Sequence, residues 1–206
     1  GSQVTAGQIL ATLTGDARRL LSGERTALNF LQTLSATATC ARRYAQSAIG
    51  SGLRVLDTRK TIPGLRLAQK YAVAVGGCEN HRIGLFDAFL IKENHIAACG
   101  GIQSAIRTAR AISADKRIEI EVENIAELQL ALSAGADAIM LDNFSAADIR
   151  ALSEFDVAGT EIEVSGNLTE TDLEKYQNTG IDFVSSGSLT KHIAAIDLSM
   201  RIIDST

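Results

Sequence analysis

Six short apolar segments recur along most of this chain, and their spacing limits what the chain can fold into. We expect strands at Leu53–Asp57, Ala88–Ile91, Ile118–Val122, Ala138–Leu141, Glu161–Val164 and Phe183–Ser186. The later segments start about 20 to 23 residues apart, which leaves room for one strand, one short helix and two tight loops. Consecutive units of this kind predict an α/β fold with a parallel sheet. The spacing alone does not tell whether the sheet closes into a barrel.

Helical patterns separate the strands, and local signals mark where the helices begin and end. Apolar residues recur at spacings of three and four over residues 102–112 and 125–132. Two pairs of a hydroxyl and an acid have the spacing of a helix start, namely Ser145 with Asp148 and Thr169 with Asp172. Gly135 and Gly180 stand where a helix would end before the next strand.

The N-terminal region differs from the repeating part. A long helical pattern is expected to start near Glu24 and to stop before the glycine-rich stretch at residues 50–52. Before it, an apolar alternation over Val4–Thr14 resembles the tail of a β domain, and the opening Gly1-Ser2 is typical of a cloning scar. We therefore expect residues 1–22 to be distinct from the α/β part of the chain.

Composition narrows the class of protein. A chain of 206 residues with 46% hydrophobic residues can bury the core of one globular domain. The net charge of −4 disfavours non-specific nucleic-acid binding. The three cysteines are widely spaced and odd in number, so we expect reduced thiols in a cytoplasmic protein. The chain has no signal peptide and no apolar run of roughly 18 residues, so no membrane segment is expected.

Basic side chains follow several of the expected strands, at the end where parallel α/β folds bind ligands. They are Arg59 and Lys60 after the first strand, His81 and Arg82 after a glycine turn, and Lys92 after the second strand. Adjacent Arg and Lys suit an anion with more than one charged group. Taken singly, each would more often belong to a solvated loop, or in the case of His81 have a structural role. Their recurrence at strand ends favours a binding site, to which Arg25 at the start of the long helix is a further candidate.

Two carboxylates, Glu121 and Asp142, end neighbouring strands and suit Mg²⁺ held partly by substrate phosphates. Asp142 could instead be a helix cap. The other acids of the third strand, Glu119 and Glu123, fit equally well on a solvated face.

Ser-Gly turns after the last two strands predict a phosphate site. They comprise Ser165, Gly166 and Asn167 after the fifth strand, and Gly187 and Ser188 after the sixth. Backbone N–H groups in such turns can bind a phosphate monoester, although each could also be an ordinary turn. The chain has no GxGxxG motif after a strand and no GxxxxGK[ST] motif, which excludes dinucleotide-binding and P-loop proteins.

These motifs together resemble the quinolinate phosphoribosyltransferase family. The resemblance rests on GERTALNFLQ at 23–32, DTRKTIPGLR at 57–66, GGCENHRIGLFDAFLIKENHI at 76–96, EIEVEN at 119–124, MLDN at 140–143, EVSGN at 163–167 and SSGSLTKH at 185–192. It covers essentially all of residues 3–203.

The resemblance implies an irregular, open TIM-like α/β barrel of six or seven parallel strands that works as a homodimer or a higher homo-oligomer. It implies transfer of a phosphoribosyl group from phosphoribosyl pyrophosphate to quinolinate with Mg²⁺, which yields nicotinate mononucleotide, pyrophosphate and CO₂. In this reading residues 1–22 are the scar plus a remnant of an N-terminal α/β sandwich domain, and residues 23–206 are the barrel domain.

The resemblance also implies roles for individual residues. Arg59, His81, Arg82 and Lys92 would contact quinolinate, and Lys60 and Lys92 would meet the phosphates. Glu121 and Asp142 would lie near the metal and the ribose, so the expected catalytic residues are Lys60, Lys92, Glu121 and Asp142. The turns at residues 165–167 and 187–188 would bind the 5′-phosphate, with Lys191 or His192 beside them. Arg25 would reach the partner subunit's site.

Two alternatives stay open. One is a related phosphoribosyltransferase of the molybdenum-transport type, against which the NHR and IKENH blocks count. The other is a barrel fragment that folds without catalysis, because most of the family's N-terminal domain is missing from the sequence. We accordingly expect weak activity or none.

Overall fold

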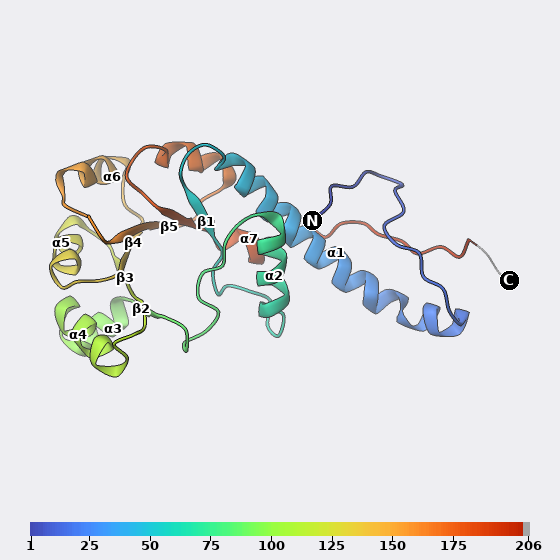
Figure 1. Ribbon diagram of the computed structural model, residues 1–206, viewed down its shortest axis with the longest axis horizontal. Helices are drawn as coiled ribbons and strands as arrows, with labels where there is room; N and C mark the ends of the chain where they lie inside the picture. Colours follow the sequence, from blue (N-terminus) through green and yellow to red (C-terminus); the bar gives the residue numbers. More distant parts are fainter. Residues whose placement is uncertain (204–206) are drawn as a thin grey trace.

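A single parallel sheet of six strands organises the computed structural model, which describes residues 1–203 (Figure 1). Its strands are β1 (Arg54–Leu56), β2 (Phe89–Ile91), β3 (Ile118–Val122), β4 (Ala138–Asp142), β5 (Glu161–Ser165) and β6 (Phe183–Ser185). The order across the sheet is β1-β6-β5-β4-β3-β2. All six predicted strands are present, and each end lies within one residue of the prediction.

Alternation along the strands separates the two faces of the sheet. Ile118, Ile120 and Val122 of β3 are fully buried on the face that packs against the helices. The residues between them, Glu119 and Glu121, point to the opposite face. The apolar core therefore lies outside the curved sheet, and acidic side chains line its inside.

Short helices cover the outer face. They are α2 (Arg66–Gly76), α3 (Glu93–Cys99), α4 (Ile102–Ile112), α5 (Ile125–Ser133), α6 (Ala146–Ala151) and α7 (Ser188–Lys191), with 3₁₀ turns η1 (Leu152–Glu154) and η2 (Glu170–Tyr176). Both predicted hydroxyl–acid pairs form capping boxes, Ser145 with Asp148 at α6 and Thr169 with Asp172 at η2. The second box opens a 3₁₀ turn rather than an α-helix.

Acidic residues at equivalent points of the repeat fix the strand starts. The Asp137 carboxylate accepts a hydrogen bond of 2.7 Å from the N–H of Ile118, and Asp182 accepts one of 2.8 Å from the N–H of Ile162. Each acid follows a glycine with positive φ, Gly135 or Gly180. Gly135 ends α5 as the sequence predicts, whereas η2 already ends at Tyr176, before Gly180.

The sheet curves into a barrel that hydrogen bonds do not close. β1 and β2 form its two edges, and an isolated bridge between Leu56 and Glu79 adds the segment after α2 beside β1. Residues 79–82 thus lie in the seam. The predicted irregular, open α/β barrel is confirmed, with six hydrogen-bonded strands.

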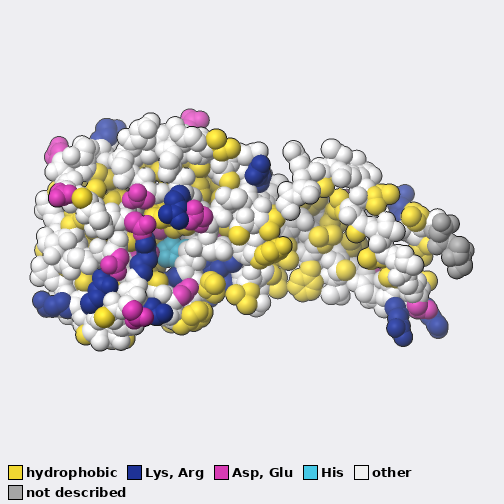
Figure 2. Space-filling view, viewed as in Figure 1, with side chains coloured by type: hydrophobic (Ala, Val, Ile, Leu, Met, Phe, Trp, Pro, Cys, Tyr) yellow, Lys and Arg dark blue, Asp and Glu magenta, His cyan; other side chains and the backbone are white. Residues whose placement is uncertain are grey.

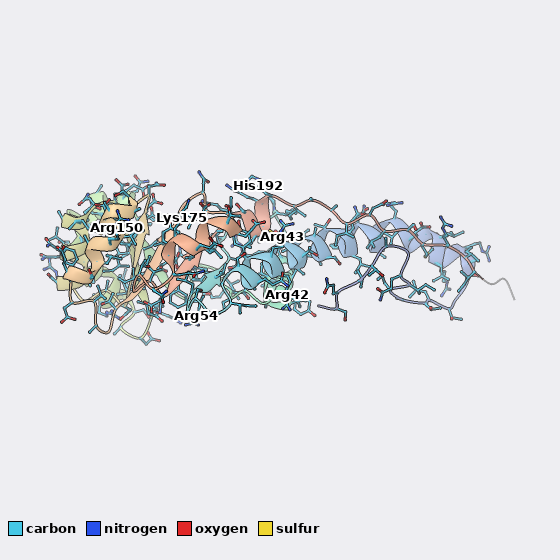
Figure 3. The ribbon with its side chains drawn as sticks, turned by 90° about the horizontal axis from the view of Figure 1, so that it is seen from above. Arg42, Arg43, Arg54, Arg150, Lys175 and His192 are labelled. Atoms are coloured by element: carbon cyan, nitrogen blue, oxygen red, sulfur yellow. The ribbon has the colours of Figure 1, made fainter. Side chains whose placement is uncertain are left out.

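The long helix α1 (Ala17–Ser47) begins earlier than predicted. Asp16 caps it by accepting the N–H of Arg19 at 3.1 Å, so the predicted start near Glu24 was wrong. Its buried residues all lie from Ala36 onward, where the helix packs on α2. The N-terminal half extends away from the barrel, and the segment after α7 runs back along it (Figures 1 and 3), with the N–H of Ile196 bonded to the carbonyl of Gln32.

The apolar alternation over Val4–Thr14 forms no strand in the part of the chain that the structure describes. Ile9 and Leu13 are exposed, because no neighbouring strand offers these residues a hydrogen-bonded edge. The alternation therefore does not form a strand in this structure. No helix among residues 1–203 has the length and apolar character needed to cross a membrane.

Candidate active site

The carboxyl ends of β2, β3 and β4 bring opposite charges together. The Lys92 ammonium, just after β2, forms an ion pair with Glu121 of β3. Lys92 is 42% exposed and Glu121 is 11% exposed, so the pair lies at the rim with the cation toward solvent. Figure 2 shows acidic and basic side chains gathered around a histidine on the barrel part of this face.

Asp142 ends β4, the neighbouring strand, in register with Ser165 of β5. Its carboxylate accepts a hydrogen bond of 2.9 Å from the side-chain amide of Asn143. Asn143 has a φ of +54°, and a Cβ on Gly166 would lie 3.7 Å from its side-chain oxygen. The MLDN and SGN segments are therefore in contact, as a shared site requires.

Lys60 lies beside the turn after β6. A Cβ on Gly187 would come within 3.0 Å of the Lys60 side chain and 3.7 Å of that of Lys191. The Thr190 hydroxyl donates to the Lys60 carbonyl at 2.9 Å and ties the two loops together. Two lysine side chains thus flank the Gly187-Ser188 turn.

Arg59 and Arg82 lie near each other at the seam. Burial lowers the pKa of the Arg82 guanidinium, and the positive charge of Arg59 lowers it further. Arg82 donates from Nη1 to the carbonyl of Ala88 at 2.9 Å, which positions its guanidinium between the seam segment and β2.

The sequence analysis missed a buried network beneath these cations. Asp57 accepts hydrogen bonds from Lys70 Nζ at 2.5 Å, from Asn80 Nδ2 at 2.7 Å and from the His81 N–H at 2.8 Å. Lys70 also donates to the His81 carbonyl at 2.6 Å. Asp57 stands at the end of a predicted strand, but Lys70 lies in a helix with no pattern that marks it.

His81 reaches from the seam to acids on the inner face of the sheet. Its Nε2 lies 2.9 Å from Glu119 of β3 and 3.6 Å from Glu163 of β5. Both glutamates are almost fully buried, so the solvated reading of Glu119 was wrong, whereas Glu123 is exposed. The alternation of IEIEVEN places Glu119 on the same face as Glu121. It does not predict that Glu119 is buried, because no local pattern shows that His81 lies opposite it.

Burial and charge separate the pKa values of the two acids. Burial raises the pKa of Glu163, and the nearby Glu119 carboxylate raises it further. Burial alone would raise the pKa of Glu119 as well, but the hydrogen bond from His81 and the positive charge of Arg117 oppose burial, and the pKa of Glu119 is lowered. Of the two acids, Glu163 therefore holds a proton more strongly.

Arg25 is a predicted site residue that lies far from the others in the structure. It is exposed on the half of α1 that extends from the barrel (Figure 1). The other predicted residues lie at the carboxyl ends of the strands or in the segments that follow them, except His81 and Arg82, which lie in the seam segment after α2. Arg42 and Arg43, labelled in Figure 3, lie where α1 meets the barrel, and Arg43 pairs there with Glu170.

Comparison with known proteins gives consistent matches. The family model described as "Quinolinate phosphoribosyl transferase, C-terminal domain" matches residues 37–201, and the corresponding N-terminal model matches residues 1–35. A probable nicotinate-nucleotide pyrophosphorylase [carboxylating] from Bacillus subtilis is 41% identical over 203 residues, covering 98% of this chain and 70% of the relative. The Mycobacterium leprae enzyme is 38% identical over 205 residues, covering 98% of this chain and 72% of its own length.

Solved structures agree. The nicotinate-nucleotide pyrophosphorylase from Francisella tularensis superposes with a TM-score of 0.85 at 51% identity, covering 89% of this chain and 65% of that one. NadC from Streptococcus pyogenes gives a TM-score of 0.86 at 46% identity, covering 91% of this chain and 66% of that one. The chain thus spans about two thirds of the length of these structures.

Proposed function

The chain belongs to the quinolinate phosphoribosyl transferase family, and we propose on that basis that it transfers a phosphoribosyl group from phosphoribosyl pyrophosphate to quinolinate. The products are nicotinate mononucleotide, pyrophosphate and CO₂, as in NAD biosynthesis. The observation that carries the proposal is the Lys92–Glu121 ion pair at the rim of an open barrel, with further cations on either side.

The cations suit a substrate with two carboxylates. Arg59 and Arg82 present planar guanidinium groups near the seam, and Lys92 adds a point charge from β2. The diacid would lie between them, above His81. Such an arrangement orients the pyridine nitrogen toward the sugar and holds the dianion while the 2-carboxylate is lost.

The phosphate groups suit the turns after β5 and β6. The 5′-phosphate would be bound by Ser165, Gly166, Asn167, Gly187 and Ser188. Lys60 and Lys191 flank the second turn with their side chains, so we assign Lys191 rather than His192 to the phosphate. The pyrophosphate would meet Lys60 and Lys92.

Electrostatics explain how these groups would promote transfer. The pyridine nitrogen attacks C1′ as pyrophosphate leaves, so positive charge develops on the ribose and negative charge on the leaving group. Glu121 and Asp142 would stabilise the ribose charge, and Lys60 and Lys92 would stabilise the leaving group. This reaction requires no side-chain nucleophile.

The two rim carboxylates also fit Mg²⁺. Glu121 and Asp142 offer hard oxygen donors on neighbouring strands, and each is only partly exposed. They would hold the ion mainly through water or substrate oxygens, because Lys92 and Asn143 already occupy one oxygen of each. When bound, Mg²⁺ neutralises charge on the pyrophosphate.

A homodimer would give Arg25 its role. Leu21, Phe30 and Leu31 are about half exposed on the same stretch of α1, which supports a partner subunit covering it. Light scattering would measure the particle mass, and a monomer at working concentration would count against the assignment of Arg25. The three free cysteines support a cytoplasmic location.

An ultraviolet assay tests the proposed activity directly. Quinolinate should be consumed only when phosphoribosyl pyrophosphate and Mg²⁺ are both present, and EDTA should stop its consumption. A folded protein that leaves quinolinate unchanged under these conditions would refute the activity and favour a non-catalytic barrel.

A further inference from the structure

Every polar atom of His81 has a hydrogen-bond partner. Its backbone N–H donates to Asp57 at 2.8 Å and its carbonyl accepts from Lys70 at 2.6 Å. On the ring, Nδ1 accepts the N–H of Arg82 at 2.8 Å, while Nε2 lies 2.9 Å from Glu119. Because Nδ1 is an acceptor, the proton of the neutral ring is on Nε2, which donates it to the carboxylate.

This tautomer excludes a metal at the histidine. Nε2 of His81 and one oxygen from each of Glu119 and Glu163 lie within 4.8 Å of one another, a grouping that could suggest a cation site. A metal-bound histidine uses a lone pair on the coordinating nitrogen and usually donates a proton from the other nitrogen. Here the other nitrogen accepts a backbone N–H, so Nε2 serves as a donor to Glu119 instead.

The acids that receive this proton are themselves enclosed. Glu119 and Glu163 are 3% and 2% exposed. Oε1 of each acid and the Ser185 hydroxyl have no hydrogen-bond partner among residues 1–203. A hydrogen bond from the Glu163 carboxyl group to the Glu119 carboxylate would give both acids a partner. It would also hold in place the Glu119 oxygen that faces His81.

Glu163, Glu119 and the His81 ring form a chain of contacts that we call the clamp, and this chain continues to Arg82. The bond from the Arg82 N–H to Nδ1 joins the histidine ring to the backbone that carries the guanidinium. Arg82 Nη1 is engaged with Ala88, and its Nε is buried without a partner in the described chain. The direction in which Nη2 of Arg82 points therefore depends on how the backbone of His81 and Arg82 is held.

We propose that Glu119 and Glu163 are positioning residues of the quinolinate site, which hold the His81 ring and, through it, the Arg82 guanidinium at the rim. The proposal rests on the proposed function. It assigns the acids to the binding of the diacid rather than to the phosphoribosyl donor, because the side chains that they hold, His81 and Arg82, are the proposed quinolinate contacts.

Steady-state kinetics on three variants test the proposal. Glu119→Leu removes the acceptor for Nε2 and should raise the KM for quinolinate by about tenfold or more, with the KM for phosphoribosyl pyrophosphate within about twofold of wild type. Glu163→Leu should act in the same direction. Glu163→Gln keeps a donor for Glu119 and should stay close to wild type. Equal increases in both KM values, or an unchanged quinolinate KM in both leucine variants, would overturn the proposal.

A spectroscopic measurement is independent of catalysis. Nitrogen-15 NMR of the histidine side chains, with the His81 signals assigned from a His81→Asn variant, should show a proton on Nε2 in the wild type and in Glu163→Gln. The Nδ1–H tautomer in the wild type would overturn the clamp even if the enzyme is active. The expected tautomer in a protein without quinolinate turnover would refute the proposed function and leave the clamp standing, so the two failures are distinguishable.

If the leucine variants do not fold, Glu119→Gln replaces them with a weaker acceptor, and an unchanged quinolinate KM in that variant counts against the proposal.

Discussion

Asp57 and Lys70 form an ion pair that is closed to solvent, with 2.5 Å between Oδ1 and Nζ and side-chain exposures of 0% and 3%. Asp57 follows β1 and Lys70 lies on α2, so the pair joins a strand end to the helix that follows it. Asn80 and His81 bond to the same carboxylate. One buried charge pair thus holds the segment that fills the seam of the barrel.

Replacing Asp57 by Asn should destabilise the fold. Lys70 would keep its charge in a buried position without a counter-ion, and loss of one partner from such a pair typically costs about 3–5 kcal/mol. Urea unfolding of the variant would measure the difference. Glu161→Gln is the matched control, because it removes a carboxylate from the exposed pair with Arg117 and should change the free energy of unfolding little. Equal effects of the two substitutions would contradict the role of the buried pair.

Gly76 allows α1 to pack closely on α2. A Cβ at this position would lie 2.4 Å from the Ala38 carbonyl and 2.5 Å from the Ala41 Cβ. Gly76→Ala should therefore lower the free energy of unfolding by about 1–3 kcal/mol through overpacking.

Gly23→Ala, on the free half of α1, provides the comparison for thermal unfolding. An added Cβ would meet nothing within 4 Å, and the substitution should stabilise the helix by about 0.5–1 kcal/mol. A stabilising Gly76→Ala would show that the helices can separate without cost.

The strands could be predicted from local signals: each is a short apolar run, and several of them follow a glycine or precede a capping pair. In β3, for example, Ile118, Ile120 and Val122 are the apolar residues of the sequence pattern, and all three pack in the core beneath the helices. The start of α1 was harder to predict. Asp16 is a good cap, but the apolar periodicity that identifies the helix begins only where the helix packs, further along the chain.

The site could be predicted only where its residues follow strands. Lys92 and Glu121 were predicted in this way, and the structure pairs them across neighbouring strands. The supporting residues depend on contacts between distant segments: Glu119 meets a histidine 38 positions earlier (119 minus 81), and the open seam decides that they face each other. Nothing local distinguishes a buried glutamate of this kind from one on a solvated strand.

The raised pKa of Glu163 predicts a pH dependence of stability. Its pKa in the folded protein is raised above the ordinary 4.5, so folding carries a proton that the unfolded chain releases above that pH. The contribution of Glu163 is therefore fully present below pH 4.5 and is lost as the pH rises through the raised value. Gln does not titrate, so the stability of Glu163→Gln relative to wild type should increase with pH, by at most about 1.4 kcal/mol per pH unit. Urea unfolding over a pH series would measure this; a difference that decreases with pH would mean that Glu163 is buried as the anion.

Burial of Cys78 predicts slow thiol chemistry. Burial raises the pKa of its thiol to about 12, and the thiol donates to the Ala41 carbonyl at 3.1 Å. The reactive thiolate is therefore scarce at pH 8, and Cys99, which is partly exposed, should react first with a disulfide reagent. Absorbance should show one fast thiol, lost in Cys99→Ser, and full reaction only in denaturant. A fast phase that persists in Cys99→Ser would contradict this order.

Lys92→Ala should abolish most of the activity while the fold remains. Lys92 is partly exposed, so its loss removes little packing, but it removes a cation from the place where the leaving pyrophosphate and a quinolinate carboxylate are expected. Loss of one such electrostatic contact typically lowers kcat by about 10²–10³-fold. Glu121 would also lose its partner, so circular dichroism and thermal unfolding should accompany the ultraviolet assay. Lys116→Ala is the matched control, because Lys116 precedes β3 and lies at the opposite end of that strand from Glu121. Unchanged turnover in Lys92→Ala would place the chemistry elsewhere, since the rim would then work without the cation around which it is assembled.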